Sequence, residues 1–199
     1  MHHRHRKKIA RQPYDESGDA KGKYSTHFFT NDVLPEIKEH IIGSVLDVGC
    51  GNGRLSHLIS KYADSVRGID PYEIQLDKYK NKNITYESVN LQDFSTSNVY
   101  DCILFWGVFY LLHDSAFTFT RSYPEQEEYH LKMLQKCKDM LSSEGSIIII
   151  DHRRRKINYN KPTWGYYNLD EMCKKLKLKN IKEFFGMGNL RVSIIKNEK

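Results

Sequence analysis

The stretch Ser44-Val45-Leu46-Asp47-Val48-Gly49-Cys50-Gly51-Asn52-Gly53 decides the fold of this chain. Its first five residues form a mostly apolar run, which predicts a short buried strand. Three glycines at alternate positions follow, and residues 54–59 then show the apolar spacing of a helix. A strand, a glycine turn and a helix start form a corner where a ligand can lie directly on the backbone, because glycine permits sharp bends and close approach.

Two classes of cofactor use such a corner. Dinucleotide sites favour G-x-G-x-x-G, but here Arg54 stands at the position of the third glycine of that pattern. The third glycine comes one residue earlier, and Asp47 lies in the strand two residues before the first glycine. This combination resembles motif I, D-x-G-x-G-x-G, of the class I S-adenosylmethionine-dependent methyltransferases. The resemblance implies that Gly49, Cys50 and Gly51 pass under the methionine part of S-adenosylmethionine, and that Asp47 helps to hold its amino group. An unrelated tight turn in an α/β domain is the alternative.

A second acid stands where this resemblance places one. Residues 65–70 predict a strand that ends in Asp70, 21 residues after Gly49. A βαβ unit places an acid there that can accept hydrogen bonds from both hydroxyls of a ribose. Pro71 would lie beside the adenine. A helix cap is the alternative role for Asp70.

The adenine contact departs from the family pattern. After a third predicted strand, residues 84–88, the family often has an acid that binds the adenine amino group. This chain has Asn90, followed by Leu91, and the Asn side-chain carbonyl can accept the same hydrogen bond. We expect Asn90 and Leu91 at the adenine, with Asp93 as the competing acceptor.

The remaining elements predict an α/β fold, a doubly wound seven-stranded, mostly parallel sheet with an antiparallel C-terminal hairpin. Phe105 and Trp106 end the fourth strand, where open α/β sheets bind ligands, and both are expected at the cofactor; plain core packing is the alternative for Trp106. A helix capped by Asn31 or Asp32 should precede the first strand, and Gly145 should close a long helix. The later predicted elements are the strand 100–106, the helix 124–141, the strand 146–150, the helix 168–176 and the hairpin strands 181–185 and 191–195.

Composition bounds the class of protein. A chain of 199 residues predicts one domain. Residues 1–23 hold seven Lys or Arg and three acids of a chain whose net charge is +6, so we expect a flexible basic segment there and a single methyltransferase domain over 24–199. No apolar run reaches 18 residues and no apolar region follows the basic start, which argues against a membrane span and a secretory signal. Four scattered cysteines without C-x-x-C argue against zinc and disulfides and for the cytoplasm.

The expected chemistry is methyl transfer from S-adenosylmethionine to an oxygen or nitrogen of a small acceptor, leaving S-adenosylhomocysteine, with no metal. Candidate general bases are His152 and Tyr110, with His113 as a further one. Arg153, Arg154 and Arg155 directly follow the fifth strand and are candidates for binding an anionic acceptor; a solvated loop is the alternative.

Two other functions stay open at this point. The first is an RNA or protein methyltransferase that uses the basic N-terminal segment, and the second is a non-catalytic cofactor-binding module. Against nucleic acid, the chain lacks D/N-P-P-Y/F, the Pro-Cys pair of cytosine-C5 enzymes and the K-D-K-E tetrad. Against a binding module, both Asp47 and Asp70 are present.

Overall fold

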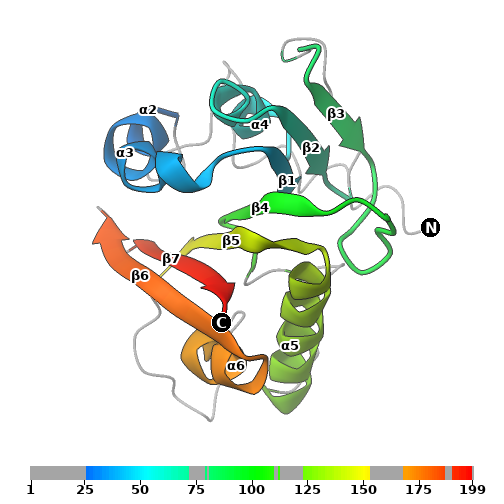
Figure 1. Cartoon of the computed structure of the whole chain (residues 1–199), viewed down its shortest axis with the longest axis vertical. Helices are drawn as coiled ribbons and strands as arrows, with labels where there is room; N and C mark the ends of the chain where they lie inside the picture. The colour runs from blue at the N-terminus through cyan, green and yellow to red at the C-terminus, as the bar shows by residue number, and fades with distance from the viewer. Residues whose placement is uncertain are drawn as a thin grey trace, which may run out of the picture.

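The structure of the chain is a computed structural model that describes residues 26–71, 79, 81–109, 112, 123–152, 168–186 and 190–198 (Figure 1). Seven strands form one sheet in the order β3-β2-β1-β4-β5-β7-β6. The strands are β1 (Ser44–Val48), β2 (Ser65–Ile69), β3 (Ile84–Glu87), β4 (Tyr100–Trp106), β5 (Leu141–His152), β6 (Leu178–Gly186) and β7 (Leu190–Asn197). The helical segments are α2 (Thr26–Phe28), the π-helical η2 (Phe29–Val33), α3 (Leu34–Ile37), the 3₁₀-helical η3 (Lys38–His40), α4 (Arg54–Ile59), α5 (Tyr123–Asp139) and α6 (Leu169–Lys175).

The pairing of the strands confirms the predicted fold. Strands β1 to β5 pair in parallel. Strand β7 runs antiparallel to both β5 and β6, which makes the C-terminal hairpin. The switch point of the sheet lies between β1 and β4. Strands β2 and β3 follow β1 on one side of it, and β5, β7 and β6 follow β4 on the other side. Ligands of open α/β sheets bind outside the carboxyl ends of the strands at such a switch point.

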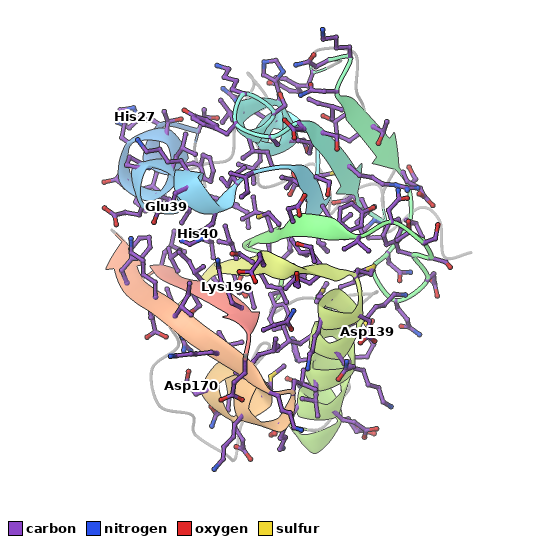
Figure 2. The ribbon with its side chains drawn as sticks, in the orientation of Figure 1. His27, Glu39, His40, Asp139, Asp170 and Lys196 are labelled. Atoms are coloured by element: carbon purple, nitrogen blue, oxygen red, sulfur yellow. The ribbon has the colours of Figure 1, made fainter. Side chains whose placement is uncertain are left out.

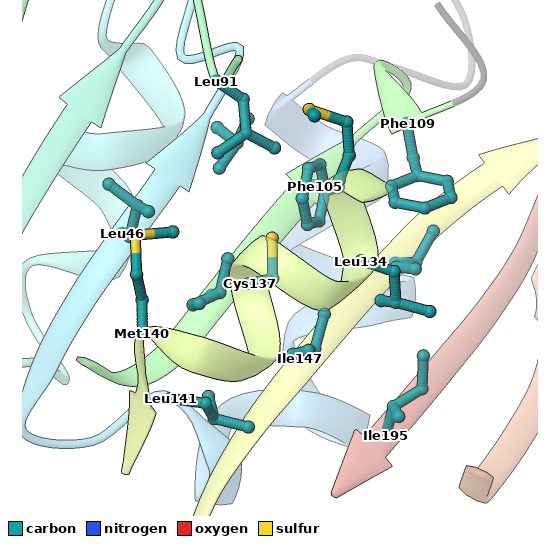
Figure 3. Close-up of a cluster of buried hydrophobic side chains, with 14 of the residues drawn as sticks. Leu46, Leu91, Phe105, Phe109, Leu134, Cys137, Met140, Leu141, Ile147 and Ile195 are labelled. Atoms are coloured by element: carbon teal, nitrogen blue, oxygen red, sulfur yellow. The ribbon is translucent and has the colours of Figure 1, made fainter. Parts of the chain in front are cut away.

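Apolar side chains cover both faces of the sheet because neighbouring residues of a strand point to opposite sides. Leu46 and Val48 of β1 belong to a core cluster shared with α5 and α6, whereas Val45 belongs to a second cluster with α2, α3 and α4. Figure 3 shows part of the first cluster, with Leu134 and Cys137 of α5 over the sheet. Figure 1 shows α5 and α6 on one side and α3 and α4 on the other, so the sheet is doubly wound.

The N-terminal helical segment, α2 to η3 (residues 26–40), also contacts β5 and β6 of the sheet. His40 Nδ1 lies 3.4 Å from Ser146 Oγ, and Lys182 Nζ pairs with Glu36 Oε2 at 2.9 Å. Burial lowers the pKa of His40, and the nearby charges of Lys196 and Lys182 lower it further against the opposing charge of Glu39. Figure 2 shows His40 and Lys196 close together where the N-terminal helical segment meets the sheet. A neutral His40 therefore fits this junction at pH 7.

Two details of the predicted elements are wrong. Asn31 and Asp32 do not cap a helix, because the helical segment starts at Thr26 and both residues lie inside η2. The buried rings of Phe28 and Phe29 extend it towards the N-terminus, so packing outweighs the capping preference. Gly145 does not close α5 either: α5 ends at Asp139, and Gly145 lies within β5, which pairs with β4 at Leu141 and again from Ser146 onward.

The predicted basic segment, residues 1–23, lies outside the described residues and stays a prediction, as does the division of the chain at residue 24. Within the described part, no helix combines the length and apolar character needed to cross a membrane.

Candidate cofactor site

The glycine turn after β1 is held against β2 by backbone hydrogen bonds. The backbone N–H groups of Gly49 and Cys50 both donate to the Ile69 carbonyl, at N···O distances of 2.8 and 3.1 Å. Gly49 has φ +74° and Gly53 has φ +78°, a left-handed conformation that other residues adopt at a cost. The turn thus presents bare backbone at the carboxyl end of β1, as a cofactor lying on it requires.

Two side chains pack against this turn that the sequence analysis did not single out. A Cβ at Gly49 would lie 2.7 Å from Cγ1 of Val108, and one at Gly53 would lie 2.5 Å from Oη of Tyr86. The Tyr86 hydroxyl donates to the Gly53 carbonyl at 3.1 Å. The sequence feature that could have indicated this contact is Gly68, because a glycine inside a strand often marks a close approach of other atoms. Gly68 of β2 pairs with Tyr86 of β3.

Asp70 follows the end of β2 and faces the same turn. Its side chain is 8% exposed, and Oδ2 accepts a hydrogen bond from the Gly51 backbone N–H at 3.0 Å. The fold therefore brings the predicted ribose acid onto the predicted methionine loop, 19 residues apart in sequence. Pro71 comes next and is exposed.

Asp47 lies beneath the turn and is 1% exposed. Its Oδ2 accepts a hydrogen bond from the Ser56 hydroxyl of α4 at 2.6 Å. Burial raises the pKa of Asp47 to about 7, because the charged form loses its hydration; the Asp70 charge adds to this rise and the Ser56 hydrogen bond opposes it. Asp47 is thus a buried acid at the corner where the cofactor amino group is expected.

The expected adenine residues form a local turn. Asn90 Oδ1 accepts from the Asp93 backbone N–H at 3.1 Å, and Asn90 Nδ2 donates to Asp93 Oδ2 at 2.6 Å. Leu91 is 3% exposed and its side chain belongs to the core cluster shared with α5. The Leu91 side chain therefore serves packing, and a cofactor contact of Asn90 stays a prediction that requires sharing its carbonyl oxygen with Asp93.

The two aromatic residues at the end of β4 point to opposite faces. Phe105 is fully buried, and its ring lies 5.0 Å from that of Phe109 in an edge-on contact. Trp106 packs on the N-terminal helical segment, with ring centroids 4.6 Å from Phe29 and 6.4 Å from Phe28. These contacts place the Phe105 ring in the core and favour packing as a main role of Trp106, and a cofactor contact of either residue stays a prediction.

His130 of α5 also fixes the loop after β4, and no pattern in the sequence pointed to it. Its side chain is fully buried, with Nε2 2.9 Å from the Phe109 carbonyl oxygen and Nδ1 2.7 Å from that of Gln126. Since Val108 of this loop packs on Gly49, His130 helps to place the loop against the glycine turn.

Of the residues expected to contact the methyl acceptor, the structure describes only the backbone of His152. His152 is the last residue of β5, and its backbone pairs with Leu190. Its side chain lies outside the described set, as do Tyr110, His113, Arg153, Arg154 and Arg155. Their roles stay predictions.

One cavity of about 640 Å³ lies away from this corner. Its lining includes Ser44, Ser65, Lys82 and Asn98, which stand at the amino ends of the strands or just before them, whereas the glycine turn and Asp70 stand at the carboxyl ends. This cavity is therefore not the cofactor corner. Among the described residues no group of three or more His, Cys, Asp or Glu could hold a metal ion, and all four cysteines are free and buried.

Known proteins share this sequence pattern and this fold. A family described as a methyltransferase domain matches residues 2–192. An α N-terminal protein methyltransferase 1 of Dictyostelium discoideum is 32% identical over 120 residues, a match that covers 56% of this chain and 40% of that protein. This chain thus spans less than half the length of that relative.

Two solved structures have the same fold at low identity. The N-methyltransferase NodS of Bradyrhizobium japonicum WM9 in complex with S-adenosylhomocysteine superposes with a TM-score of 0.63 at 14% identity, over 84% of each chain. The 1,6-didemethyltoxoflavin-N1-methyltransferase of Burkholderia thailandensis superposes with a TM-score of 0.63 at 12% identity, over 86% of this chain and 81% of that chain. With its acid–glycine turn, its seven-stranded sheet and a family match over nearly its whole length, the chain belongs to the methyltransferase domain family, within the class I S-adenosylmethionine-dependent methyltransferases.

Proposed function

We propose that this protein transfers a methyl group from S-adenosylmethionine to an oxygen or nitrogen of a small, anionic acceptor. The cofactor part rests on one observation: Asp47, the glycine turn and Asp70 meet at one corner, where Gly51 N–H donates to Asp70. Bare backbone and two carboxylates fit the methionine part, the ammonium group and the ribose diol of this cofactor.

The cofactor supplies a reactive sulfonium methyl group, so the protein's task is positioning. The glycine turn and Asp70 would hold the methionine and ribose parts. The loop after β4, fixed by Val108 and His130, would form a wall of the acceptor side. Holding the acceptor atom in line and close to the methyl group can lower the barrier by roughly 7–11 kcal/mol.

Two features support the choice of acceptor. The planar guanidinium groups of Arg153, Arg154 and Arg155 would follow β5 directly and match carboxylate or phosphate. Both structural relatives named above are N-methyltransferases by name, which favours nitrogen over oxygen. His152 or Tyr110 would serve as a base where the acceptor atom carries a proton.

A second candidate is methylation of a protein α-amino group. It is supported by the 32% identity to the Dictyostelium protein methyltransferase. The two candidates differ in acceptor size but not in the use of the cofactor corner.

Purified protein should bind S-adenosylhomocysteine, because the corner offers partners for its ammonium group and its ribose. Isothermal titration calorimetry measures this directly. Failure of the full-length, folded protein to bind either S-adenosylhomocysteine or S-adenosylmethionine at millimolar concentration would overturn the methyltransferase proposal.

A methyl-labelled cofactor should mark the acceptor in a mixture of small metabolites and N-terminal peptides, with detection by mass spectrometry. For an anionic small acceptor, single Arg→Ala changes should raise KM and leave cofactor affinity unchanged. Alternate residues of an extended segment point to opposite sides, so Arg153 and Arg155 should behave alike and Arg154 differently. An uncharged acceptor, or three variants that all match the wild type, contradicts the anionic assignment; label in the peptides alone favours the second candidate.

A further inference from the structure

A group of three polar side chains lies under the glycine turn, and each comes from a different element. Asp47 belongs to β1, Ser56 to α4 and Tyr86 to β3. The Ser56 hydroxyl donates to Asp47 Oδ2 at 2.6 Å, and Ser56 also lies near enough to the Tyr86 phenol to favour its ionised form, against the larger effect of burial on the pKa of Tyr86. The Tyr86 hydroxyl in turn reaches the Gly53 carbonyl at 3.1 Å. These contacts connect the buried acid to the third glycine of the turn.

Among the described residues, no cation is one of the strongest electrostatic partners of Asp47. Asp47 is 1% and Ser56 0% exposed. The described ionisable side chains that interact with Asp47 include Asp70 after β2, Cys50 in the turn, Cys102 of β4 and Tyr86 of β3. Burial raises the pKa of both thiols and of the phenol, so these three groups stay neutral near pH 7. Asp70 lies close enough for its negative charge to disfavour a second one on Asp47.

We propose that a large share of Asp47 side chains are hydrogen-bonded carboxylic acids in the ligand-free protein at neutral pH, that the ammonium group of the bound cofactor displaces this proton into solvent, and that Ser56 positions both forms of the acid while Tyr86 holds the glycine turn beside it. The inference rests on the proposed function, because the ammonium group belongs to that cofactor. The balance is simple: one proton leaves the carboxyl group for the buffer, the ammonium group keeps its three protons, and a charge pair replaces a neutral acid.

The Asp47–Ser56 pair can satisfy both forms of the acid because the hydroxyl groups can rotate. With Asp47 protonated, its O–H donates to Ser56 Oγ. With Asp47 ionised, the Ser56 O–H donates to the carboxylate, and the 2.6 Å distance suits such a charge-assisted bond. The Tyr86 hydroxyl donates to Gly53 in both cases. The Asp47–Ser56 hydrogen bond is therefore kept in both forms, and losing it would cost about 1–3 kcal/mol.

The test is calorimetric titration in two buffers of different ionisation enthalpy, phosphate and Tris, which reports the protons released on binding. Because the pKa of Asp47 lies at about 7, S-adenosylhomocysteine should release about half a proton at pH 7. Its Kd should weaken about tenfold from pH 8 to pH 6, because the protonated acid must first lose its proton. The matched probe is 5′-methylthioadenosine, which lacks the ammonium group and should release none.

Three variants separate the roles. Asp47→Asn should abolish the proton release, and any pH dependence of the Kd that this variant retains belongs to other groups. Ser56→Ala should move the midpoint of the Kd profile to higher pH, because the Ser56 hydrogen bond lowers the pKa of Asp47. Tyr86→Phe should weaken binding a few-fold at every pH and leave the midpoint in place. Tyr62→Phe, on a side chain that is 45% exposed, is the matched control and should behave as the wild type.

The outcomes distinguish this inference from the proposed function. Absence of S-adenosylhomocysteine binding at every pH overturns the proposed function. Binding without proton release, with a Kd that does not change from pH 6 to pH 8, overturns the displaced proton alone. An unchanged midpoint in a folded Ser56→Ala variant shows that Ser56 does not position the acid, even where Asp47→Asn fails to fold.

Discussion

Replacing Asp70 with alanine should weaken S-adenosylhomocysteine binding by about 30- to 700-fold. The change removes two charge-assisted hydrogen bonds to the ribose, on the order of 2–4 kcal/mol together. It also removes the acceptor for the Gly51 N–H, which leaves the turn less well fixed. Calorimetry on wild type and variant measures the effect, and 5′-methylthioadenosine should lose a similar factor because it carries the same ribose.

Two further variants separate the charge of Asp70 from its hydrogen bond to Gly51 and control for the loss of a negative charge. Asp70→Asn keeps an oxygen that can accept from Gly51 but carries no charge, so its affinity should lie between those of the wild type and the alanine variant. Asp64→Ala removes the same charge from an exposed residue just before β2 and should bind normally. Unchanged affinity in a folded Asp70→Ala protein contradicts the ribose assignment and leaves the methyltransferase proposal standing on the wild type.

The sheet could be predicted from sequence because its strands are short apolar runs bounded by turn residues. The predicted strand 44–48 is β1 without change, and 65–70 differs from β2 by one residue. The relative positions of Asp47, the glycine turn and Asp70 also followed, because a βαβ unit fixes where the ends of neighbouring parallel strands lie. Local spacing was sufficient for these features.

The sequence could not say which face of a strand receives each side chain. Phe105 and Trp106 are neighbours at the end of β4 and were both expected at the cofactor. One enters the core on the α5 side and the other meets Phe28 and Phe29. A shift of one residue exchanges the two faces, and apolar neighbours on a strand buried on both sides carry no signal that decides between them.

The sequence also could not predict individual hydrogen bonds between distant parts of the chain. Tyr86 meets Gly53 across 33 residues, and His130 meets Phe109 across 21 residues. Both are single hydrogen bonds set by how elements pack, and neither has a sequence period. The candidate acceptor residues differ again, since Arg153, Arg154 and Arg155 fall outside the described residues and only their place after β5 is known.

Replacing Gly49 with alanine should destabilise the protein and weaken cofactor binding. At φ +74° an alanine costs about 1–2 kcal/mol. Its Cβ would lie 2.7 Å from Cγ1 and 2.8 Å from Cγ2 of Val108, and such overpacking typically costs about 1–3 kcal/mol. The free energy of unfolding should therefore fall by about 2–5 kcal/mol in urea titrations. The turn must also move, so S-adenosylhomocysteine should bind at least tenfold more weakly.

A double-mutant cycle with Val108→Ala separates the two causes. The double variant Gly49→Ala/Val108→Ala removes both Cγ atoms but keeps the positive φ and the Val108 Cβ position, 2.9 Å away. It should therefore recover part of the packing loss, so the combined destabilisation should be smaller than the sum of the single changes by about 1 kcal/mol or more. Strict additivity would show that Val108 does not confine the turn. A Gly49→Ala protein that binds S-adenosylhomocysteine as tightly as the wild type would show that the cofactor does not lie on this turn.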